Sequence, residues 1–213
     1  MSETYYVKTF GGLEITNDNV TVNIVELFGK QLVNLLQVLL FHSEKPVQKD
    51  ELIDILWPES KNPSSALKFS IFRLRSELNE IDFFKDKEVI VTTRKGYILN
   101  PNLDWNIDFV ELQKAYNQIN EGAELLDEKE FKIARKIFRL YQGRFYASPS
   151  QLHWILQKQE VFRQMYVKTM MRTSCYLYTQ KRYDEMMLMN YQAVLIEPFN
   201  EGPEVMLNVS DQT

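Results

Sequence analysis

Cysteine is nearly absent from this 213-residue sequence, which contains a single one, Cys175. One thiol cannot form an internal disulfide, and a chain of this length buries enough apolar surface to fold without one. Chains of this kind are typical of a reducing compartment, so we expect a cytoplasmic protein in which Cys175 is a small buried hydrophobic residue.

Histidine and glycine are also scarce, with two and seven residues. His42 and His153 are far apart in the sequence, and neither has the Cys/His spacing of a metal site. No glycine-rich phosphate loop is present, which excludes an ATPase module. We therefore expect a protein that is not an enzyme and that needs neither a metal nor a cofactor.

Long apolar runs are missing as well. The longest one, Leu32–Phe41, is interrupted by Asn34 and Gln37, and it is well short of the roughly 20 residues that cross a bilayer. Residues 1–8 are polar and lack the apolar segment of a signal peptide. The sequence therefore predicts neither contact with a membrane nor export.

Positive charge is not in excess over the whole chain, whose formal net charge is -4, whereas nucleic-acid-binding proteins usually carry a basic surface. The distribution of charge is more informative than the total. Residues 1–60 have four basic and nine acidic side chains, a net charge of -5, while residues 61–100 have eight basic and five acidic ones, a net charge of +3. The positive charge is therefore concentrated in residues 61–100.

The first half of the chain combines strand and helix patterns. β-Branched and aromatic residues in 5–15 and 19–26, around turn-forming Gly and Asn residues, predict short antiparallel strands. Apolar residues at helical spacing predict one helix between Gly29 and Pro46, a second before Pro58 and a third over residues 64–79. Two β-rich runs around the basic segment TTRKG then predict a hairpin. This order is typical of a winged helix-turn-helix.

The second half, from about residue 104, has almost no strand signal. Helices are expected near residues 107–121, 128–141, 151–180 and 183–196. Residues 167–200 have the length of one TPR-like helix-turn-helix repeat, which does not stand alone, so either the array stops abruptly or the natural chain continues. We predict a mainly α protein: an α+β winged helix-turn-helix over residues 1–100, then an all-α TPR-like domain over residues 104–213.

The predicted helix over residues 64–79 has two unlike faces. At about 100° per residue, four apolar side chains fall in one narrow sector that faces the core: Leu67, Ile71, Leu74 and Leu78. The remaining surface has Ser65, Lys68, Phe69, Phe72 and Arg73, with Arg75 nearer the core boundary. A helix of this kind fits the major groove of DNA, where Arg pairs with guanine and apolar groups contact thymine methyl groups.

The predicted hairpin tip supports the same hypothesis. Thr93, Arg94 and Lys95 lie between the two β-rich runs, where basic side chains would contact the neighbouring DNA backbone or minor groove. The predicted function is sequence-specific binding of double-stranded DNA, with the recognition helix 64–79 in the major groove and the basic wing 92–96 beside it.

The sequence resembles a bacterial regulator family. The segments KPVQKDELIDILWPE, PSSALKFSIFRLRSEL, IVTTRKGYIL and IDFVEL, in this order, are similar to the SARP/AfsR-type transcriptional regulators, in which an OmpR-type winged helix precedes a bacterial transcriptional activator domain. The resemblance extends from about Tyr6 to Asn200. It implies a DNA-binding transcriptional activator that recruits RNA polymerase, with residues 68, 69, 72, 73 and 75 on the recognition helix and residues 94 and 95 on the wing.

Two questions stay open at this stage. Phe69 and Phe72 are suited to contact thymine methyl groups, to dock on the helical domain, or to form a dimer patch. The helical domain is expected to mediate homodimerisation, polymerase contact or the sensing of a small-molecule or peptide effector. The alternative function is a helical-repeat scaffold for protein interactions, whose winged helix no longer binds DNA. The sequence does not give the operator, the regulated genes or the direction of regulation.

Overall fold

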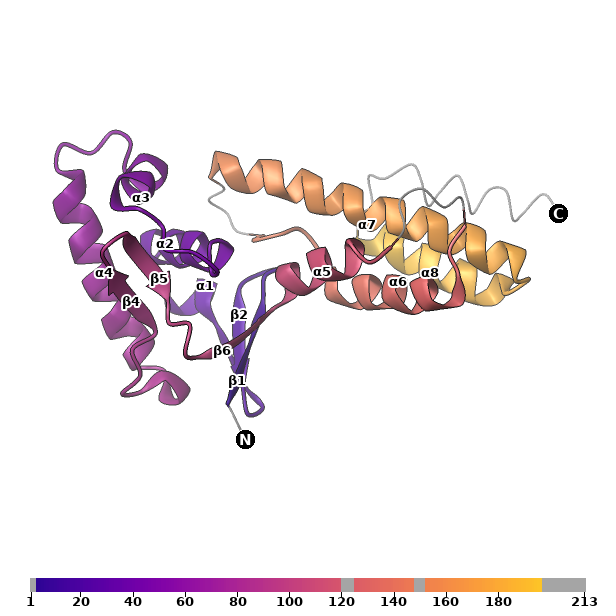
Figure 1. The fold of residues 1–213 in the computed structure, drawn as a ribbon, viewed down its shortest axis with the longest axis horizontal. Helices are drawn as coiled ribbons and strands as arrows, with labels where there is room; N and C mark the ends of the chain where they lie inside the picture. Colours follow the sequence, from indigo (N-terminus) through magenta and orange to yellow (C-terminus); the bar gives the residue numbers. More distant parts are fainter. Residues whose placement is uncertain (1–2, 120–124, 148–151, 197–213) are drawn as a thin grey trace. The chain divides into compact units, whose positions relative to one another are not determined.

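The computed structural model describes residues 3–119, 125–147 and 152–196 (Figure 1). The described residues form two compact units, one of residues 3–7, 13–106 and 152, the other of residues 8–12, 107–119, 125–147 and 153–196. An α+β region with a winged helix is followed by a helical region, which confirms the predicted fold class. The domain limits 1–100 and 104–213 and the TPR-like character of the second half stay predictions.

The first half of the chain contains the elements expected of a winged helix. The strands are β1 (Thr4–Lys8), β2 (Glu14–Asn17), β3 (Val20–Asn23), β4 (Ile90–Thr93), β5 (Gly96–Leu99) and β6 (Asp104–Ile107). The helices are α1 (Ile24–Leu27), α2 (Lys30–Phe41), α3 (Lys49–Leu56) and α4 (Pro63–Asn79), followed by the 3-10 turn η1 (Asp82–Phe84). One sheet has the strand order β3-β2-β1-β6, and β4 and β5 form a separate antiparallel hairpin.

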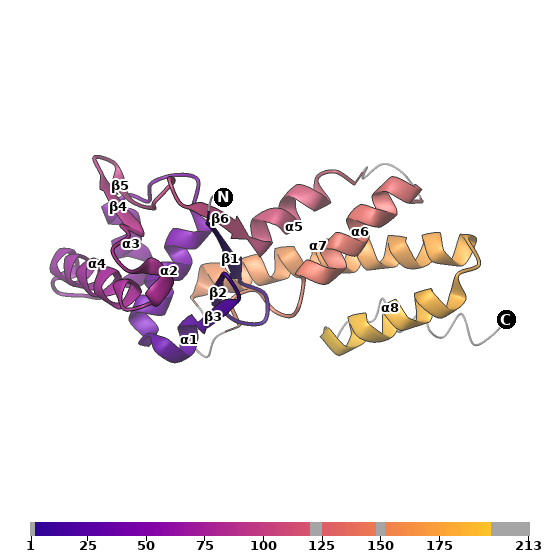
Figure 2. The ribbon, with the colours of Figure 1, turned by 90° about the horizontal axis from the view of Figure 1, so that it is seen from below.

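The core of this unit lies between α2, α3, α4 and the hairpin. Apolar residues recur on one face of each helix, so the faces that meet are buried, among them Leu35, Leu39, Leu52 and Leu74, each 0% exposed. Figures 1 and 2 both show α4 beside α2 and α3. Because the leucine face of α4 is buried, its other face is presented to solvent.

Two short elements differ from the sequence prediction. Ile24–Leu27 is a helical turn and not the end of a strand, because the side chain of Asn23 accepts hydrogen bonds from the backbone N–H groups of Val25 and Glu26 and so caps a helix. The strand β6 was not expected after residue 100. It exists because it pairs with β1, which lies about a hundred residues earlier in the chain.

The second unit is built from helices α5 (Asp108–Tyr116), α6 (Glu128–Leu140), α7 (His153–Thr179) and α8 (Tyr183–Ile196). They occur close to the four expected positions. The predicted end of the repeat, beyond Ile196, lies outside the described residues. A capping box at Asp127 and Glu130 begins α6, and the side chains of Phe131, Ala134 and Ile137 are buried.

The segment Lys8–Gly12 joins this helical unit through a buried carboxylate. Asp108 accepts hydrogen bonds from the backbone N–H groups of Thr9, Phe10 and Phe109 at 2.7, 3.1 and 2.7 Å, and from the Thr9 hydroxyl. Burial raises the pKa of Asp108 above its usual value, although these hydrogen bonds oppose the shift. The ring of Phe10 packs edge-on against Phe162 in the same core.

Candidate nucleic-acid interface

Helix α4 begins where its sequence favours a start. Asn62 is the N-cap residue, without a side-chain hydrogen bond, and Pro63 stands in the first turn, where its missing N–H has no helical partner to lose. The buried residues of α4 are Leu67, Ser70, Ile71, Leu74 and Leu78, which includes the four predicted core positions. The rotation of the helix about its axis is thereby fixed.

Most of the α4 residues that were predicted from the sequence to contact DNA lie on the solvent-facing side of the helix. Ser65, Lys68, Phe69, Phe72 and Arg73 are exposed. The two phenylalanine residues have exposed fractions of 62% and 69%, which are large for side chains of this type. Apolar and basic groups thus share one surface of the helix.

Arg73 makes a surface ion pair with Glu77 one turn later. The guanidinium Nη2 lies 3.1 Å from the Glu77 carboxylate, and the two side chains are 52% and 37% exposed. An exposed pair at this spacing contributes only about 0.3–0.5 kcal/mol. Arg73 can therefore leave Glu77 for a phosphate or a base at little cost.

Arg75 has a different environment from Arg73. Its Nε and Nη2 atoms donate hydrogen bonds to the carbonyl oxygen of Ile90 at 3.1 and 2.8 Å, and Nη2 also donates to the Thr92 hydroxyl at 2.8 Å. The guanidinium therefore ties α4 to strand β4 of the hairpin. The structure gives Arg75 a positioning contact, and its role in contacting DNA stays a prediction.

Replacing Arg75 by alanine is expected to lower the free energy of unfolding by about 2 kcal/mol, because charge-assisted hydrogen bonds to the partly buried Ile90 carbonyl are lost. Urea denaturation checks this value. Arg73→Ala, the same change on the same helix, removes only an exposed pair and is expected to cost about 0.5 kcal/mol or less. Equal losses in the two variants would show that Arg75 does not hold the hairpin.

The hairpin presents two basic side chains at its tip. Arg94 and Lys95 form the two-residue connection between β4 and β5, and both are exposed. The hydroxyl of Thr93 closes this turn, since it donates to the Gly96 carbonyl and accepts from the Lys95 N–H, both at 3.1 Å. Thr93 therefore shapes the tip, while Arg94 and Lys95 are the groups that it offers to a partner.

The base of the hairpin is fixed to the rest of the unit by Val47. The N–H of Val47 donates to the carbonyl of Tyr97 at 2.8 Å, and the N–H of Tyr97 donates to the carbonyl of Val47 at 3.0 Å. Gly96 lies beside this bridge with a φ of +144°, and a Cβ placed on it would come within 1.8 Å of the Val47 carbonyl oxygen. This close approach of Gly96 to Val47 was not predicted from the sequence, although a glycine directly after the two residues of a hairpin tip is a typical sign of an unusual backbone conformation.

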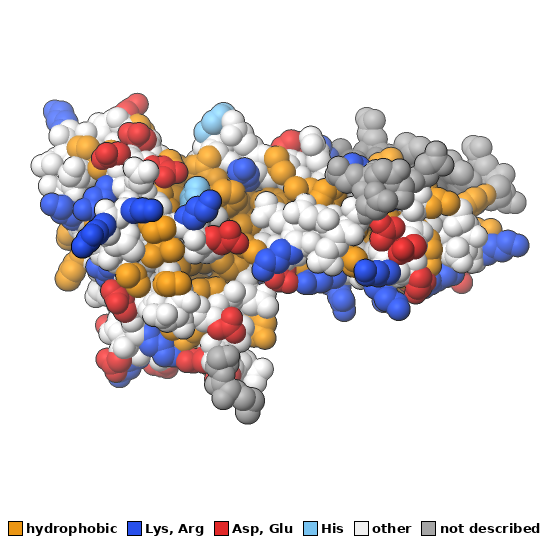
Figure 3. All heavy atoms as spheres, viewed as in Figure 1, with side chains coloured by type: hydrophobic (Ala, Val, Ile, Leu, Met, Phe, Trp, Pro, Cys, Tyr) orange, Lys and Arg blue, Asp and Glu red, His pale blue; other side chains and the backbone are white. Residues whose placement is uncertain are grey.

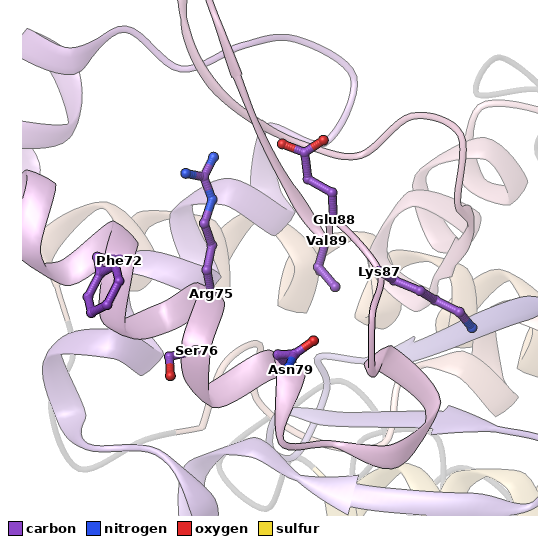
Figure 4. Close-up of a pocket in the computed structure, with 7 residues that line it drawn as sticks. All are labelled: Phe72, Arg75, Ser76, Asn79, Lys87, Glu88 and Val89. Atoms are coloured by element: carbon purple, nitrogen blue, oxygen red, sulfur yellow. The ribbon is translucent and has the colours of Figure 1, made fainter.

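A pocket of about 400 Å³ lies between the C-terminal half of α4 and the segment that leads into β4 (Figure 4). It is lined by Phe72, Arg75, Ser76, Asn79, Lys87, Glu88 and Val89. The Lys87 ammonium group donates hydrogen bonds to the Glu3 carboxylate and the Tyr5 hydroxyl. Burial alone would lower the pKa of Lys87, but these two contacts outweigh that effect, and the pKa is raised above its usual value. Lys87 is therefore a tether for the N-terminal strand.

Electrostatics of this region favour an anionic partner. Figure 3 shows blue side chains on this part of the surface beside orange and red ones, in keeping with the eight basic and five acidic residues of the segment 61–100. Among residues 3–119, 125–147 and 152–196, no group of three or more His, Cys, Asp or Glu side chains is arranged to hold a metal ion. Within the same ranges, no helix combines the length and the apolar character needed to span a membrane.

Comparisons with known proteins agree with this geometry. Residues 25–99 match the family described as transcriptional regulatory protein, C terminal. The chain is similar to the solved structure of Mycobacterium tuberculosis EmbR in complex with a low-affinity phosphopeptide, with a TM-score of 0.63 and 16% sequence identity. This similarity covers 96% of the chain and 53% of EmbR, so the chain spans about half the length of that relative.

A second solved structure, the DNA-binding domain of E. coli CadC, is 25% identical over 46% of this chain and 94% of its own, with a TM-score of 0.34. No curated protein sequence matches the chain. The family match lies on the winged helix, and the EmbR similarity extends the fold assignment into the helical unit. Residues 25–99 therefore match the family described as transcriptional regulatory protein, C terminal, and the chain shares the fold of EmbR.

Proposed function

We propose that this protein is a sequence-specific, non-enzymatic transcriptional activator that acts in the cytoplasm and binds double-stranded DNA through its winged helix. The recognition helix, residues 64–79 of α4, enters the major groove, and the wing, residues 92–96, contacts the adjacent backbone or minor groove. The observation that carries this proposal is the exposed face of α4 beside a hairpin tip made of Arg94 and Lys95.

The dimensions and charges of the two elements suit this role. The major groove, about 12 Å wide, admits an α-helix, and the phosphates on its rims attract basic side chains. Arg75 ties β4 to α4 through Ile90 and Thr92, so the wing and the helix meet DNA as one preorganised surface. Lys68 and Arg73 then supply charge on the helix, and Arg94 and Lys95 supply it on the wing.

The helical unit is proposed to make the protein contacts of an activator: RNA polymerase, a second copy of the chain, or a small-molecule or peptide effector. Helix α8 supports such a role because it exposes five large apolar side chains: Tyr183, Met187, Leu188, Tyr191 and Leu195. Helical arrays commonly bind partners through exposed surfaces of this kind. Light scattering at rising protein concentration measures homodimer formation directly.

An alternative function is a protein-interaction scaffold whose winged helix no longer binds DNA. The observations that favour it are the two exposed phenylalanine rings on α4, the pairing of Arg73 with Glu77 and the net charge of -4. Such a protein would retain the fold while its affinity for phosphates was weak.

A binding selection with fragments of the source genome separates the two functions. The full chain is incubated with the fragment library at low salt, and bound DNA is sequenced. The activator proposal predicts an enriched motif, and binding of the recovered site is expected to weaken steeply as salt rises, because phosphate contacts release counterions. A selection that enriches no motif at low salt would contradict the proposal and favour the scaffold.

A further inference from the structure

The exposed surface of α4 offers few groups that recognise bases by hydrogen bonding. Arg75 is bound to Ile90 and Thr92, and the side-chain oxygen of Asn79 accepts a hydrogen bond from the Asp86 N–H. Over residues 64–79 this leaves Lys68, Arg73 and Glu77 as the long polar side chains at the surface, the last two paired with each other, together with the short exposed hydroxyls of Ser64, Ser65 and Ser76. Hydrogen bonding from this helix therefore provides limited discrimination between base pairs.

Apolar surface is the larger feature of the same face. Phe69 and Phe72 are three residues apart, hence on neighbouring positions of one helix face, and they are 62% and 69% exposed. Figure 4 shows the ring of Phe72 on the outside of α4, at the edge of the pocket. A partner that covers these rings must supply apolar groups and must also tolerate the positive charges of Lys68 and Arg73 beside them.

The major groove of DNA meets both requirements. The C5 methyl group of thymine is the apolar group on the base edges there, and the phosphates on either side are complementary to basic side chains. Three residues of helix rise by about 4.5 Å, close to the spacing of about 3.4 Å between stacked base pairs, so the two rings match neighbouring base pairs.

We propose that Phe69 and Phe72 recognise thymine methyl groups on neighbouring base pairs, and that the preferred DNA site has thymines where these rings enter the groove. The inference deepens the proposed function and rests on it. A protein partner is a weaker occupant, because two phenyl groups expose a few hundred Å² at most, while each side of a stable protein interface buries about 800 Å².

Replacing thymine by deoxyuridine tests this inference, because the two bases pair identically and differ only in the C5 methyl group. In the site recovered by the binding selection, each thymine is replaced in turn and affinity for the full chain is measured. At one or more adjacent positions the affinity is expected to fall about four-fold for each methyl group removed. Burial of one such group contributes about 0.8 kcal/mol, which corresponds to this factor in the binding constant.

Variants of the two rings then assign the effect to residues. Phe69→Ala and Phe72→Ala are expected to weaken binding of the thymine site and to abolish the thymine–deoxyuridine difference at the matching position. Both side chains are exposed, so thermal unfolding should be close to that of the original chain. Leu27→Ala, which changes another exposed apolar side chain of the same unit (53% exposed), is the control and should keep the full difference.

Three results would overturn the inference, and they are distinguishable. If the chain binds DNA with a sequence motif but no thymine position responds to deoxyuridine, the proposed function stands and thymine recognition by the two rings does not. If both phenylalanine variants keep the difference, other residues contact the methyl groups. If no DNA is bound even at low salt, the proposed function fails and this inference fails with it.

Discussion

Gly96→Ala is expected to lower the free energy of unfolding of the winged helix by about 3 kcal/mol. The backbone of Gly96 has a φ of +144°, which side-chain-bearing residues rarely adopt, and the new Cβ would come within 1.8 Å of the Val47 carbonyl oxygen. This steric clash is removed only if the Val47–Tyr97 bridge opens, because the clashing oxygen belongs to the backbone and cannot rotate away as a side chain could. The wing would then lose its attachment to the segment before α3.

Urea denaturation measures the loss, and amide exchange locates it. The N–H groups of Val47 and Tyr97 donate across the bridge, so their protection from exchange should fall more than that of amides in α2. Gly12→Ala is the matched control, because a Cβ at Gly12 has no neighbour within 4 Å. If the two alanine variants were equally stable, the close approach of Gly96 to Val47 would not be what holds the wing.

The outline of the winged helix was predictable because its signals are local. The spacing of Leu67, Ile71, Leu74 and Leu78 follows the helical period, so the buried and exposed faces of α4 could be assigned without knowledge of their partners. The basic hairpin tip was equally visible, since two β-rich runs flank it directly.

Other features depend on contacts that no local pattern contains. Arg75 lies near the core boundary on a helical wheel, and only the fold brings the Ile90 carbonyl, 15 residues later, to its guanidinium. Strand β6 depends on pairing with β1, and the buried carboxylate of Asp108 depends on Thr9, 99 residues earlier. In the α1 turn, the cap provided by Asn23 outweighs the β propensity of Ile24 and Val25.

The basic side chains of the proposed interface are not equally available to DNA, a difference that the amino-acid composition does not reveal. Of the basic side chains in residues 61–100, Lys87 and Arg75 are engaged inside the unit, and Arg73 is paired at the surface. The other five basic side chains of this segment are exposed: Lys61, Lys68 and Lys85, and Arg94 and Lys95 at the wing tip. Because Arg94 and Lys95 are adjacent at the tip of one hairpin, removing both measures the contribution of the wing to phosphate binding.

Replacing Arg94 and Lys95 together by alanine is expected to weaken binding to all DNA sequences alike, by about fifty-fold at 0.1 M salt. Each phosphate contact contributes a slope of about 0.9 to the dependence of log affinity on log salt, so two lost contacts should reduce the slope by about two. The loss should vanish as salt approaches 1 M. Salt titrations of the selected site and of an unrelated duplex, followed by fluorescence anisotropy, measure both quantities.

Lys129→Ala with Lys132→Ala is the control for net charge, because it removes two exposed positive charges from α6, outside the winged helix. If Arg94 and Lys95 contact phosphates, the Lys129/Lys132 variant should keep the original salt slope. If the effect arises from net charge alone, the Lys129/Lys132 and Arg94/Lys95 variants should lose the same amount of slope. Equal slopes for the wing variant and the original chain would mean that Arg94 and Lys95 do not touch phosphates. The relative affinities for the selected and the unrelated duplex should stay unchanged in the wing variant, since phosphate contacts carry no sequence information.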